Sequence, residues 1–327
     1  ADGAVRLMGP HRRHLTGLVN AVARRLIREA PAILADQDAA RLNCPKWLWQ
    51  TWKKTYGVET TTKMMDIMLS EPPLDLTFKN EPEKWREALQ GEMLPTGSMR
   101  RTAGGAIQTL PGFSEGEWWV QDAAAALPMA LLGKDIKGRA VLDLCAAPGG
   151  KTAQMAAAGA QVTAVDNEQN RMALVEANLE RLNLQAETIV ADIITWRPEK
   201  PFDFILLDAP CSATGTIRRH PDIWHLRTAK VPKEMALVQD GMLAAAVDML
   251  APGGVVSFCT CSLQPEEGEA RIEALFATDA PVSRQPITAD ELFGLEQLIT
   301  PLGDMRTLPH YLGGMDGFYA SRLVKTP

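Results

Sequence analysis

The stretch AVLDLCAAPGGKT, residues 140–152, contains the pattern that decides the fold class. Its apolar beginning predicts a buried strand, and its end predicts the start of a helix. Between them lies a tight turn in which Gly149 and Gly150 allow a ligand to approach the backbone closely. Taken alone the turn is a weak signal, because a strand-to-helix turn also needs glycine for structural reasons. It lacks the GxxxxGK(S/T) pattern, so it is not a phosphate-binding loop.

Similar units follow this stretch along the chain. Apolar runs that end in an acid or a cysteine predict further strands, and an amphipathic helix follows the second of them. The expected strands are AQVTAVD (160–166), AETIVADI (186–193), FDFILLDAP (202–210) and GGVVSFCTCS (253–262), with a helix near 233–250 before the last. Strands that alternate with helices form a parallel sheet covered on both faces. We therefore expect residues 119–327 to form an α/β domain with a doubly wound, mostly parallel sheet.

Three acids, Asp166, Asp192 and Asp208, end successive strands of this predicted sheet. Ligands of such sheets bind at the carboxyl ends of the strands. An acid about 20 residues after the glycine turn suits ribose hydroxyls, as Asp166 would, and Asp192 suits the amine of adenine. Each acid alone could equally cap the next helix, but three at one edge are harder to explain in this way. Because GxGxxG and the phosphate loop are both absent, these acids favour S-adenosylmethionine as cofactor.

Two cysteines also lie just beyond strand ends, Cys211 after FDFILLDAP and Cys261 after VVSFCT. A cysteine in a strand is most often a buried structural residue. At a ligand-binding edge it can instead be a reactive thiolate. Methylation of a pyrimidine at C5 requires such a thiolate, because its covalent addition at C6 makes C5 nucleophilic. Asp208 is the candidate for stabilising the adduct at a ring nitrogen, and the pattern alone leaves open which cysteine attacks.

Basic residues follow the first of these cysteines, in TGTIRRHPDIWHLR (214–227). Arg218, Arg219, His220 and Arg227 could hold RNA phosphates beside an extruded base, or could pair with the acids of the chain. The net charge of the chain is −6, but residues 1–65 hold 11 Lys/Arg and 5 Asp/Glu. A basic arm on an acidic body is compatible with phosphate binding, and a solvated helical face explains it equally well.

Upstream of the predicted sheet the pattern is mainly helical. HLTGLVNAVARRLIRE (14–29) predicts an amphipathic helix. CPKWLWQTWKKTYG (44–57) mixes three tryptophans with lysines, which we interpret as packing of a helical subdomain rather than as base stacking. In residues 71–118, LDLTFK, SMRRT and GAIQTL predict short strands and EPEKWREALQGEM predicts a helix. This alternation predicts a small α+β unit.

Composition and cysteine spacing exclude several other classes. No apolar run reaches about 18 residues, so we expect no membrane span. Five cysteines without a CxxC pair argue against a disulfide framework and against a zinc site. Reduced thiols fit the cytoplasm, where we expect the protein to be located. We also expect it to hold no metal and to be a monomer.

These segments together resemble the RsmB (Sun/Fmu-type) family of bacterial ribosomal RNA 5-methylcytosine methyltransferases. The resemblance is carried by LDLCAAPGGKT, VDNEQNR, VAD, LLDAPCSATGTIRRHPDI, TCSLQPEEGE and GMDGFYASRLVK. It implies a Rossmann-like catalytic domain at 119–327, an RRM-like subdomain at 71–118 and, at 1–70, a helical remnant of a NusB-like domain most of which is missing from the chain.

The resemblance also implies a reaction and the residues that perform it. The reaction is methylation of cytosine C5 in small-subunit (16S) ribosomal RNA, with Cys261 attacking C6 and Cys211 releasing the methylated product. Implied cofactor contacts are Cys145, Ala146, Ala147, Pro148, Gly149, Gly150, Lys151, Asp166, Arg171, Asp192 and Asp208. Two alternatives stay open, namely the same chemistry on transfer RNA and a non-catalytic, RNA-binding ribosome-assembly factor.

Overall fold

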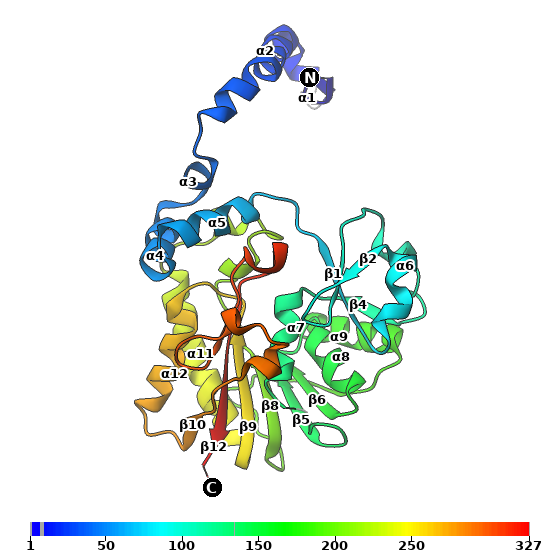
Figure 1. Cartoon of the computed structure of the whole chain (residues 1–327), viewed down its shortest axis with the longest axis vertical. Coiled ribbons are helices and arrows are strands. Elements are labelled where there is room, and N and C mark those ends of the chain that lie inside the picture. The colour runs from blue at the N-terminus through cyan, green and yellow to red at the C-terminus, as the bar shows by residue number, and fades with distance from the viewer. Residues whose placement is uncertain (1, 7–9, 134, 327) are drawn as a thin grey trace. The chain divides into compact units, whose positions relative to one another are not determined.

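The protein is described by a computed structural model that covers residues 2–6, 10–133 and 135–326 (Figure 1). The chain divides into two compact units, residues 1–46 and 47–327. Across these described ranges, no helix combines the length and the apolar character needed to cross a membrane.

The first unit is helical. It contains α1 (Asp2–Arg6), η1 (Pro10–Leu15), α2 (Thr16–Ala35) and α3 (Ala39–Asn43). The helix predicted at 14–29 is confirmed as α2, which continues to Ala35 although Pro31 lies inside it. None of the residues of α2 is buried, so its predicted apolar stripe, which includes Leu18, Val22 and Leu26, is exposed.

Two helices, α4 (Lys46–Tyr56) and α5 (Val58–Met68), begin the second unit. The predicted packing role of the tryptophans is confirmed for Trp52, which is fully buried. Its ring lies edge-on to that of Trp224, with the centroids 6.1 Å apart. Trp52 therefore packs α4 against α10 (Ile223–Leu226), which follows the first of the two cysteines in the chain.

A small antiparallel sheet with strand order β2-β3-β1-β4 comes next. Its strands are β1 (Leu74–Phe78), β2 (Gly91–Met93), β3 (Met99–Arg101) and β4 (Trp118–Val120). LDLTFK and SMRRT are thus confirmed as strands. The predicted helix is shorter than expected, because η2 (Pro82–Trp85) and α6 (Arg86–Leu89) stop at Gln90, whose φ is 52°. The residues after Gln90 form β2 instead.

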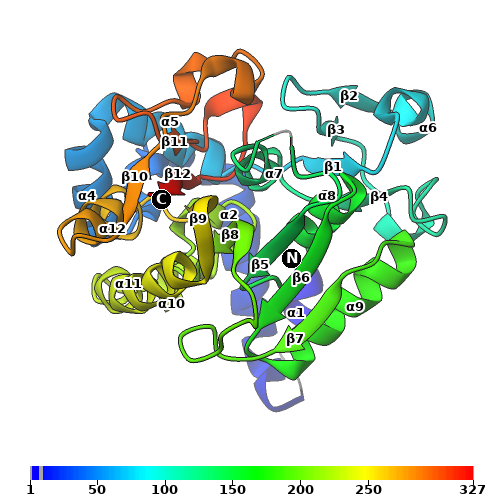
Figure 2. The ribbon, with the colours of Figure 1, turned by 90° about the horizontal axis from the view of Figure 1, so that it is seen from below.

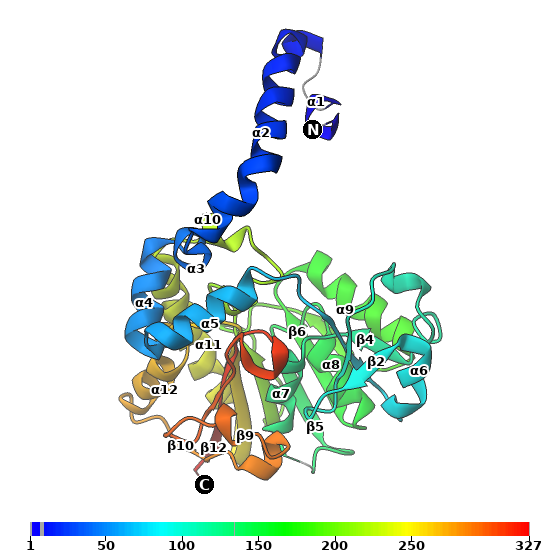
Figure 3. The ribbon, with the colours of Figure 1, turned by 45° about the horizontal axis from the view of Figure 1, so that its top comes forward.

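The strand predicted for GAIQTL is wrong, since this segment contains the 3-10 turn η3 (Ile107–Thr109). Ile107 and Leu110, three residues apart, both pack on the core of the small sheet. That spacing suits one face of a tight helical turn and not the alternation of a strand. Figure 3 shows the small sheet near α9 (Gln169–Leu182), and Lys79 donates a hydrogen bond to the carbonyl of Leu182 over 3.0 Å.

The large sheet has the strand order β10-β12-β9-β8-β5-β6-β7, with β11 paired to β12. Its strands are β5 (Ala140–Leu144), β6 (Gln161–Asp166), β7 (Glu187–Val190), β8 (Phe202–Asp208), β9 (Leu250–Thr260), β10 (Val282–Arg284), β11 (Met305–Arg306) and β12 (Tyr319–Lys325). The pairs from β7 through β9 are parallel, whereas β12 pairs antiparallel with each of its partners. The predicted doubly wound, mostly parallel sheet is therefore confirmed.

Helices cover both faces of this sheet (Figure 2). The remaining helices and turns are α7 (Ala123–Ala130), α8 (Gly150–Ala157), α10 (Ile223–Leu226), α11 (Val231–Met249), α12 (Glu269–Phe276), η4 (Thr214–Thr216), η5 (Pro265–Glu267), η6 (Ala289–Leu292), η7 (Glu296–Leu298) and η8 (Tyr311–Gly313). Alternate residues of β5 face opposite cores: Leu142 packs with α11 and α12, and Val141 packs with α8. The sheet is thus buried on both faces. The carboxyl ends of its parallel strands are where a ligand can bind.

Candidate active site

The carboxyl ends of β5, β6 and β8 border a cavity of about 400 Å³. This first cavity is lined by Cys145, Ala147, Asp166, Asn167, Glu168, Arg171, Asp192, Ile193, Asp208, Ala209, Pro210, Cys211, Ala213, Met242 and Cys261. A second cavity of about 350 Å³ lies on the α7 and α8 side and shares Cys145, Ala147, Asp208 and Cys261 with the first. The structure therefore brings both cysteines and all three strand-end acids to one place.

The turn between β5 and α8 shapes both cavities. Gly149 has a φ of 101°, and a Cβ there would lie 3.2 Å from the backbone of Val175 on α9, so glycine is required. A Cβ on Gly150 would meet only the Gln121 side chain, at 3.6 Å. Of the turn residues, Cys145 and Ala147 line both cavities, whereas Ala146, Pro148, Gly150 and Lys151 line the second one.

Asp166, at the end of β6, has a buried carboxylate that faces the first cavity. One oxygen accepts a hydrogen bond of 3.2 Å from the backbone N–H of Ala147. Arg171 on α9 lies 3.4 Å from the same oxygen and also donates to the carbonyl of Ala147. Arg171 thereby holds the Asp166 carboxylate and the turn against each other.

Asp192, just beyond β7, lines the same cavity but is exposed. Its carboxylate accepts a hydrogen bond of 2.9 Å from the backbone N–H of Ile194. The alternative explanation of a strand-end acid as a cap for the following turn therefore holds for this residue. Its remaining lone pairs still face the cavity.

Lys151 and Asp208 form a close ion pair, with Nζ 2.6 Å from Oδ2. Burial alone would lower the pKa of Lys151, but the adjacent Asp208 carboxylate outweighs it and raises that pKa above its usual value. The ammonium also lies 5.2 Å from the centroid of the Phe318 ring. Lys151 is therefore a permanent cation, and it lines the second cavity together with Asp208 and Phe318.

The thiols of Cys211 and Cys261 are neighbours, with their sulfur atoms 3.4 Å apart. Both line the first cavity, and Cys261 also lines the second. The hydrogen bond with Cys261 and burial raise the pKa of Cys211 well above its usual value. Cys259 fits the structural reading instead, because it is fully buried in β9 and donates to Asp208 over 3.5 Å.

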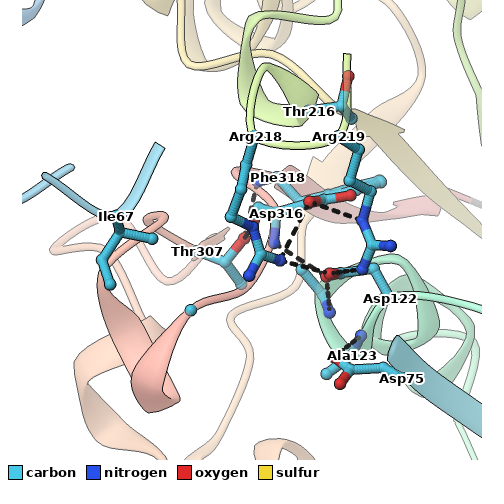
Figure 4. A network of polar contacts seen from close by, with 12 residues as sticks. Ile67, Asp75, Asp122, Ala123, Thr216, Arg218, Arg219, Thr307, Asp316 and Phe318 are labelled. Atoms are coloured by element: carbon cyan, nitrogen blue, oxygen red, sulfur yellow. Dashed lines mark hydrogen bonds and ion pairs between the residues drawn. The ribbon is translucent and has the colours of Figure 1, made fainter. Parts of the chain in front are cut away.

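The structure favours pairing with acids of the chain for two of the arginines. Arg218 and Arg219 pair with Asp122 and Asp316, as Figure 4 shows, while Arg219 and His220 also line the second cavity. The Arg218 side chain is only 2% exposed, and the carboxylates of Asp122 and Asp316 are almost as deeply buried. Burial and the neighbouring Asp122 raise the pKa of Asp316 to about 7, against the effect of the two arginines.

Loss of this pairing is expected to destabilise the fold strongly. Asp122→Ala would leave Arg218 buried without its partner at 3.0 Å, which costs about 3–5 kcal/mol in the free energy of unfolding. Urea unfolding would measure this difference. Asp203→Ala is the control, because it breaks the half-exposed pair with Arg139 and should cost less than about 1 kcal/mol. Equal effects of the two substitutions would contradict a buried network.

Comparison with known proteins agrees with this geometry. Residues 130–324 match the family model described as 16S rRNA methyltransferase RsmB/F. The chain belongs to this family. Two curated relatives are named Ribosomal RNA small subunit methyltransferase B, from Cronobacter sakazakii and Erwinia tasmaniensis. Each is 37% identical to this chain, over 99% of it and 76% of the relative. The resemblance inferred from the motifs is thus confirmed.

Solved structures show the same fold. The protein PH0851 superposes with a TM-score of 0.76 at 26% identity, over 89% of this chain and 69% of its own. NSun6 from Pyrococcus horikoshii, solved with SFG, superposes with a TM-score of 0.73 at 20% identity, over 86% of this chain and 98% of its own. Both solved structures therefore share the architecture of this chain.

S-adenosylmethionine is the cofactor of this RsmB/F methyltransferase, and the first cavity fits it. A carboxylate pair, Asp166 and Asp192, suits hydroxyl and amine donors and would repel a pyrophosphate. Ile193 and Met242 supply apolar surface for a flat ring. The cavity volume also lies within the usual range for small ligands.

Sequence reasoning missed several residues of the second cavity, among them Gln121, Asp122, Asp316 and Phe318. Asp316 and Phe318 lie inside the quoted motif GMDGFYASRLVK, which was a usable signal. Gln121 and Asp122 stand between β4 and α7 without any motif, and only the tertiary structure brings them to the site.

Proposed function

We propose that this chain transfers a methyl group from S-adenosylmethionine to C5 of a cytosine in small-subunit (16S) ribosomal RNA. The observation that carries the proposal is the pair of thiols 3.4 Å apart, with Cys261 on the wall that the two cavities share. A thiol between a cofactor cavity and a second cavity can bond to a base while its neighbour carbon is methylated. The name of the curated relatives supports ribosomal RNA as the substrate.

In this proposal the first cavity holds the cofactor and the second holds the target base. Asp166 accepts hydrogen bonds from the ribose hydroxyls, and Asp192 accepts one from the adenine amine. When bound, the cofactor supplies a methyl group activated by a positively charged sulfur. Arg171 and the Ala147 N–H keep the Asp166 carboxylate in place.

The chain's own residues then act on the base in two steps. Cys261 gives its proton to solvent and adds to C6 as the thiolate, and the ring electrons shift toward N3 so that C5 becomes nucleophilic and takes the methyl group. Cys211, as a thiolate that its raised pKa makes a strong base, next removes the proton from C5, the double bond between C5 and C6 re-forms, and Cys261 leaves as the thiolate. The Lys151–Asp208 pair supplies a donor and an acceptor for the polar edge of the ring, at 2.6 Å from each other.

The target RNA is tested with labelled cofactor, protein-free 16S ribosomal RNA and total transfer RNA. We expect methylation of 16S ribosomal RNA at cytosine C5, located by bisulfite sequencing, and none of transfer RNA. Methylation of transfer RNA alone would favour the second candidate substrate. Binding of the cofactor without methyl transfer to either RNA would contradict an enzyme and favour a ribosome-assembly factor.

The role of Asp166 predicts a loss of cofactor affinity. Hydrogen bonds to a charged group contribute about 1.5–3 kcal/mol, so Asp166→Ala should weaken binding by about 10- to 100-fold. Isothermal titration with S-adenosylmethionine measures this, with thermal unfolding as the check on folding. Asp192→Ala should have a smaller effect, because its carboxylate is exposed and already accepts from Ile194. Unchanged affinity in Asp166→Ala would refute its assignment.

The division into 1–70, 71–118 and 119–327 stays a proposal, in which residues 1–118 select the RNA. Among the basic residues near 218, Arg218 is buried in ion pairs and Arg227 donates to the carbonyl of Ser212, whereas Arg219 and His220 line the second cavity beside the proposed base. A cytoplasmic location and a monomeric state stay predictions.

A further inference from the structure

Each of the two cysteines is followed by a serine, and both serines bind one carboxylate. Glu267, at the end of η5, is fully buried. Its Oε1 accepts the backbone N–H of Ser212 over 2.6 Å, and its Oε2 accepts the hydroxyls of Ser212 and, over 2.6 Å, Ser262. The reaction proposed above uses neither Glu267 nor the serines.

We propose that Glu267 is a positioning residue that sets the distance between the two reacting sulfurs. The inference rests on the proposed function, in which the sulfurs must serve adjacent ring carbons C5 and C6 in turn. Because Ser212 and Ser262 directly follow Cys211 and Cys261, a carboxylate that holds both serines also holds both cysteine backbones. The observed separation of 3.4 Å between the sulfurs is the result of this clamp.

Further hydrogen bonds give the clamp its stiffness. The Ser212 and Ser262 hydroxyls lie 3.2 Å apart, and the hydroxyl of Thr214 accepts the N–H of Leu263 over 3.0 Å. Gln239 on α11 joins the Cys211 side, donating to the carbonyl of Pro210 over 2.8 Å. A buried hydrogen-bond network restricts the groups that it joins, and loss of one member disturbs the others.

The two loops also meet directly through backbone contacts. The N–H of Gly215 donates to the carbonyl of Cys261 over 2.9 Å, and the N–H of Gly317 donates to the carbonyl of Gly215 over 2.9 Å. A Cβ on Gly215 would lie 1.9 Å from the backbone oxygen of Gly317. The loop at Gly215 and the segment at Gly317 are therefore too close together for any residue other than glycine at position 215. Glu267 therefore acts on loops that have little room to adjust in any other way.

The chain offers a matched control for a buried carboxylate. Asp304 is also fully buried and accepts hydrogen bonds from the Tyr319 hydroxyl over 2.7 Å and from Arg284 over 3.2 Å. Burial raises the pKa of both carboxyls. The two carboxyls therefore have comparable surroundings, and replacing either one by its amide is a comparable change. Asp304 lines neither of the two cavities and bonds to neither cysteine loop.

The test measures the sulfur pair directly. Wild type, Glu267→Gln, Glu267→Asp and Asp304→Asn are treated with dibromobimane, which bridges neighbouring thiols, and mass spectrometry identifies the bridge between Cys211 and Cys261. Methyl-transfer kinetics and cofactor affinity are measured on the same samples. A small misplacement of reacting groups can cost about 100-fold in rate, so we expect a loss of that order in kcat for Glu267→Gln, with a slower bridge and unchanged cofactor affinity.

Glu267→Asp should recover part of the bridging rate, and Asp304→Asn should keep both bridging rate and kcat close to wild type. Wild-type bridging and kcat in Glu267→Gln would overturn the proposal. Equal losses in Asp304→Asn would overturn it too, since they would reflect general destabilisation. If the wild type methylates no RNA, the proposed function fails, while the bridging comparison still decides the role of Glu267.

Single hydroxyl deletions provide the same comparison if Glu267→Gln does not fold. Ser262→Ala loosens the Cys261 side and should slow formation of the RNA adduct. Ser212→Ala loosens the Cys211 side and should slow its release, so that adduct accumulates on denaturing gels. Identical behaviour of the two variants would contradict a clamp with one arm on each cysteine.

Discussion

Replacement of Cys261 by alanine is expected to abolish methyl transfer. Without the sulfur that adds to C6, C5 of cytosine is not nucleophilic. Among the described residues that line both cavities, the other thiol is that of Cys145, and burial raises its pKa far above the usual value. Loss of a covalent nucleophile costs more than about 10³-fold in kcat. The measurement is transfer of labelled methyl groups to 16S ribosomal RNA.

The control for this variant is Cys44→Ala. Cys44 lines neither of the two cavities, so its removal tests the effect of losing a thiol that the proposed reaction does not use. We expect Cys44→Ala to retain activity and Cys261→Ala to bind the cofactor with wild-type affinity. Substantial methyl transfer by Cys261→Ala would show that another residue attacks the base.

Replacement of Cys211 by alanine should instead trap the covalent complex. Cys261 can still add to C6 and C5 can still be methylated, but the C5 proton is no longer removed, so the bond to Cys261 persists. Turnover should fall below one methyl group per enzyme molecule. A slowly migrating, RNA-linked protein should accumulate on denaturing gels.

The double variant Cys211→Ala/Cys261→Ala is the control, and it should give no RNA-linked protein. The reverse pattern would contradict the assignment. If Cys211→Ala formed no adduct while Cys261→Ala accumulated one, then Cys211 would be the nucleophile. The two sulfurs lie 3.4 Å apart and both line the first cavity, but of the two cysteines Cys261 alone also lines the second.

The catalytic sheet could be predicted because its signals are local. Each parallel strand is a short apolar run that ends in, or is soon followed by, an aspartate or a cysteine, and the fold class then puts these residues at the carboxyl ends of the sheet. The glycine turn was also predicted, although Gly149 is required mainly by its φ of 101° and its contact with α9. Local pattern and global fold agree in this part of the chain.

Other features depend on contacts between distant residues, which a single sequence does not display. Arg218 and Arg219 look like surface cations until Asp122 and Asp316, almost 100 residues away on either side, are seen beside them. Lys151 was assigned to the cofactor from its motif, yet its partners Asp208 and Phe318 place it in the second cavity. Glu267 lies inside the quoted motif TCSLQPEEGE, but the sequence does not show its role, because that role depends on Ser212, 55 residues earlier.

The most direct test of the proposed chemistry is to identify the residue that carries the RNA in the Cys211→Ala complex. The complex is digested with nuclease and protease, and the peptide that bears a nucleotide is sequenced by mass spectrometry. We expect a cytidine methylated at C5 and attached to Cys261. Attachment to any other residue, or an unmethylated base on Cys261, would contradict the proposed order of attack, methyl transfer and release.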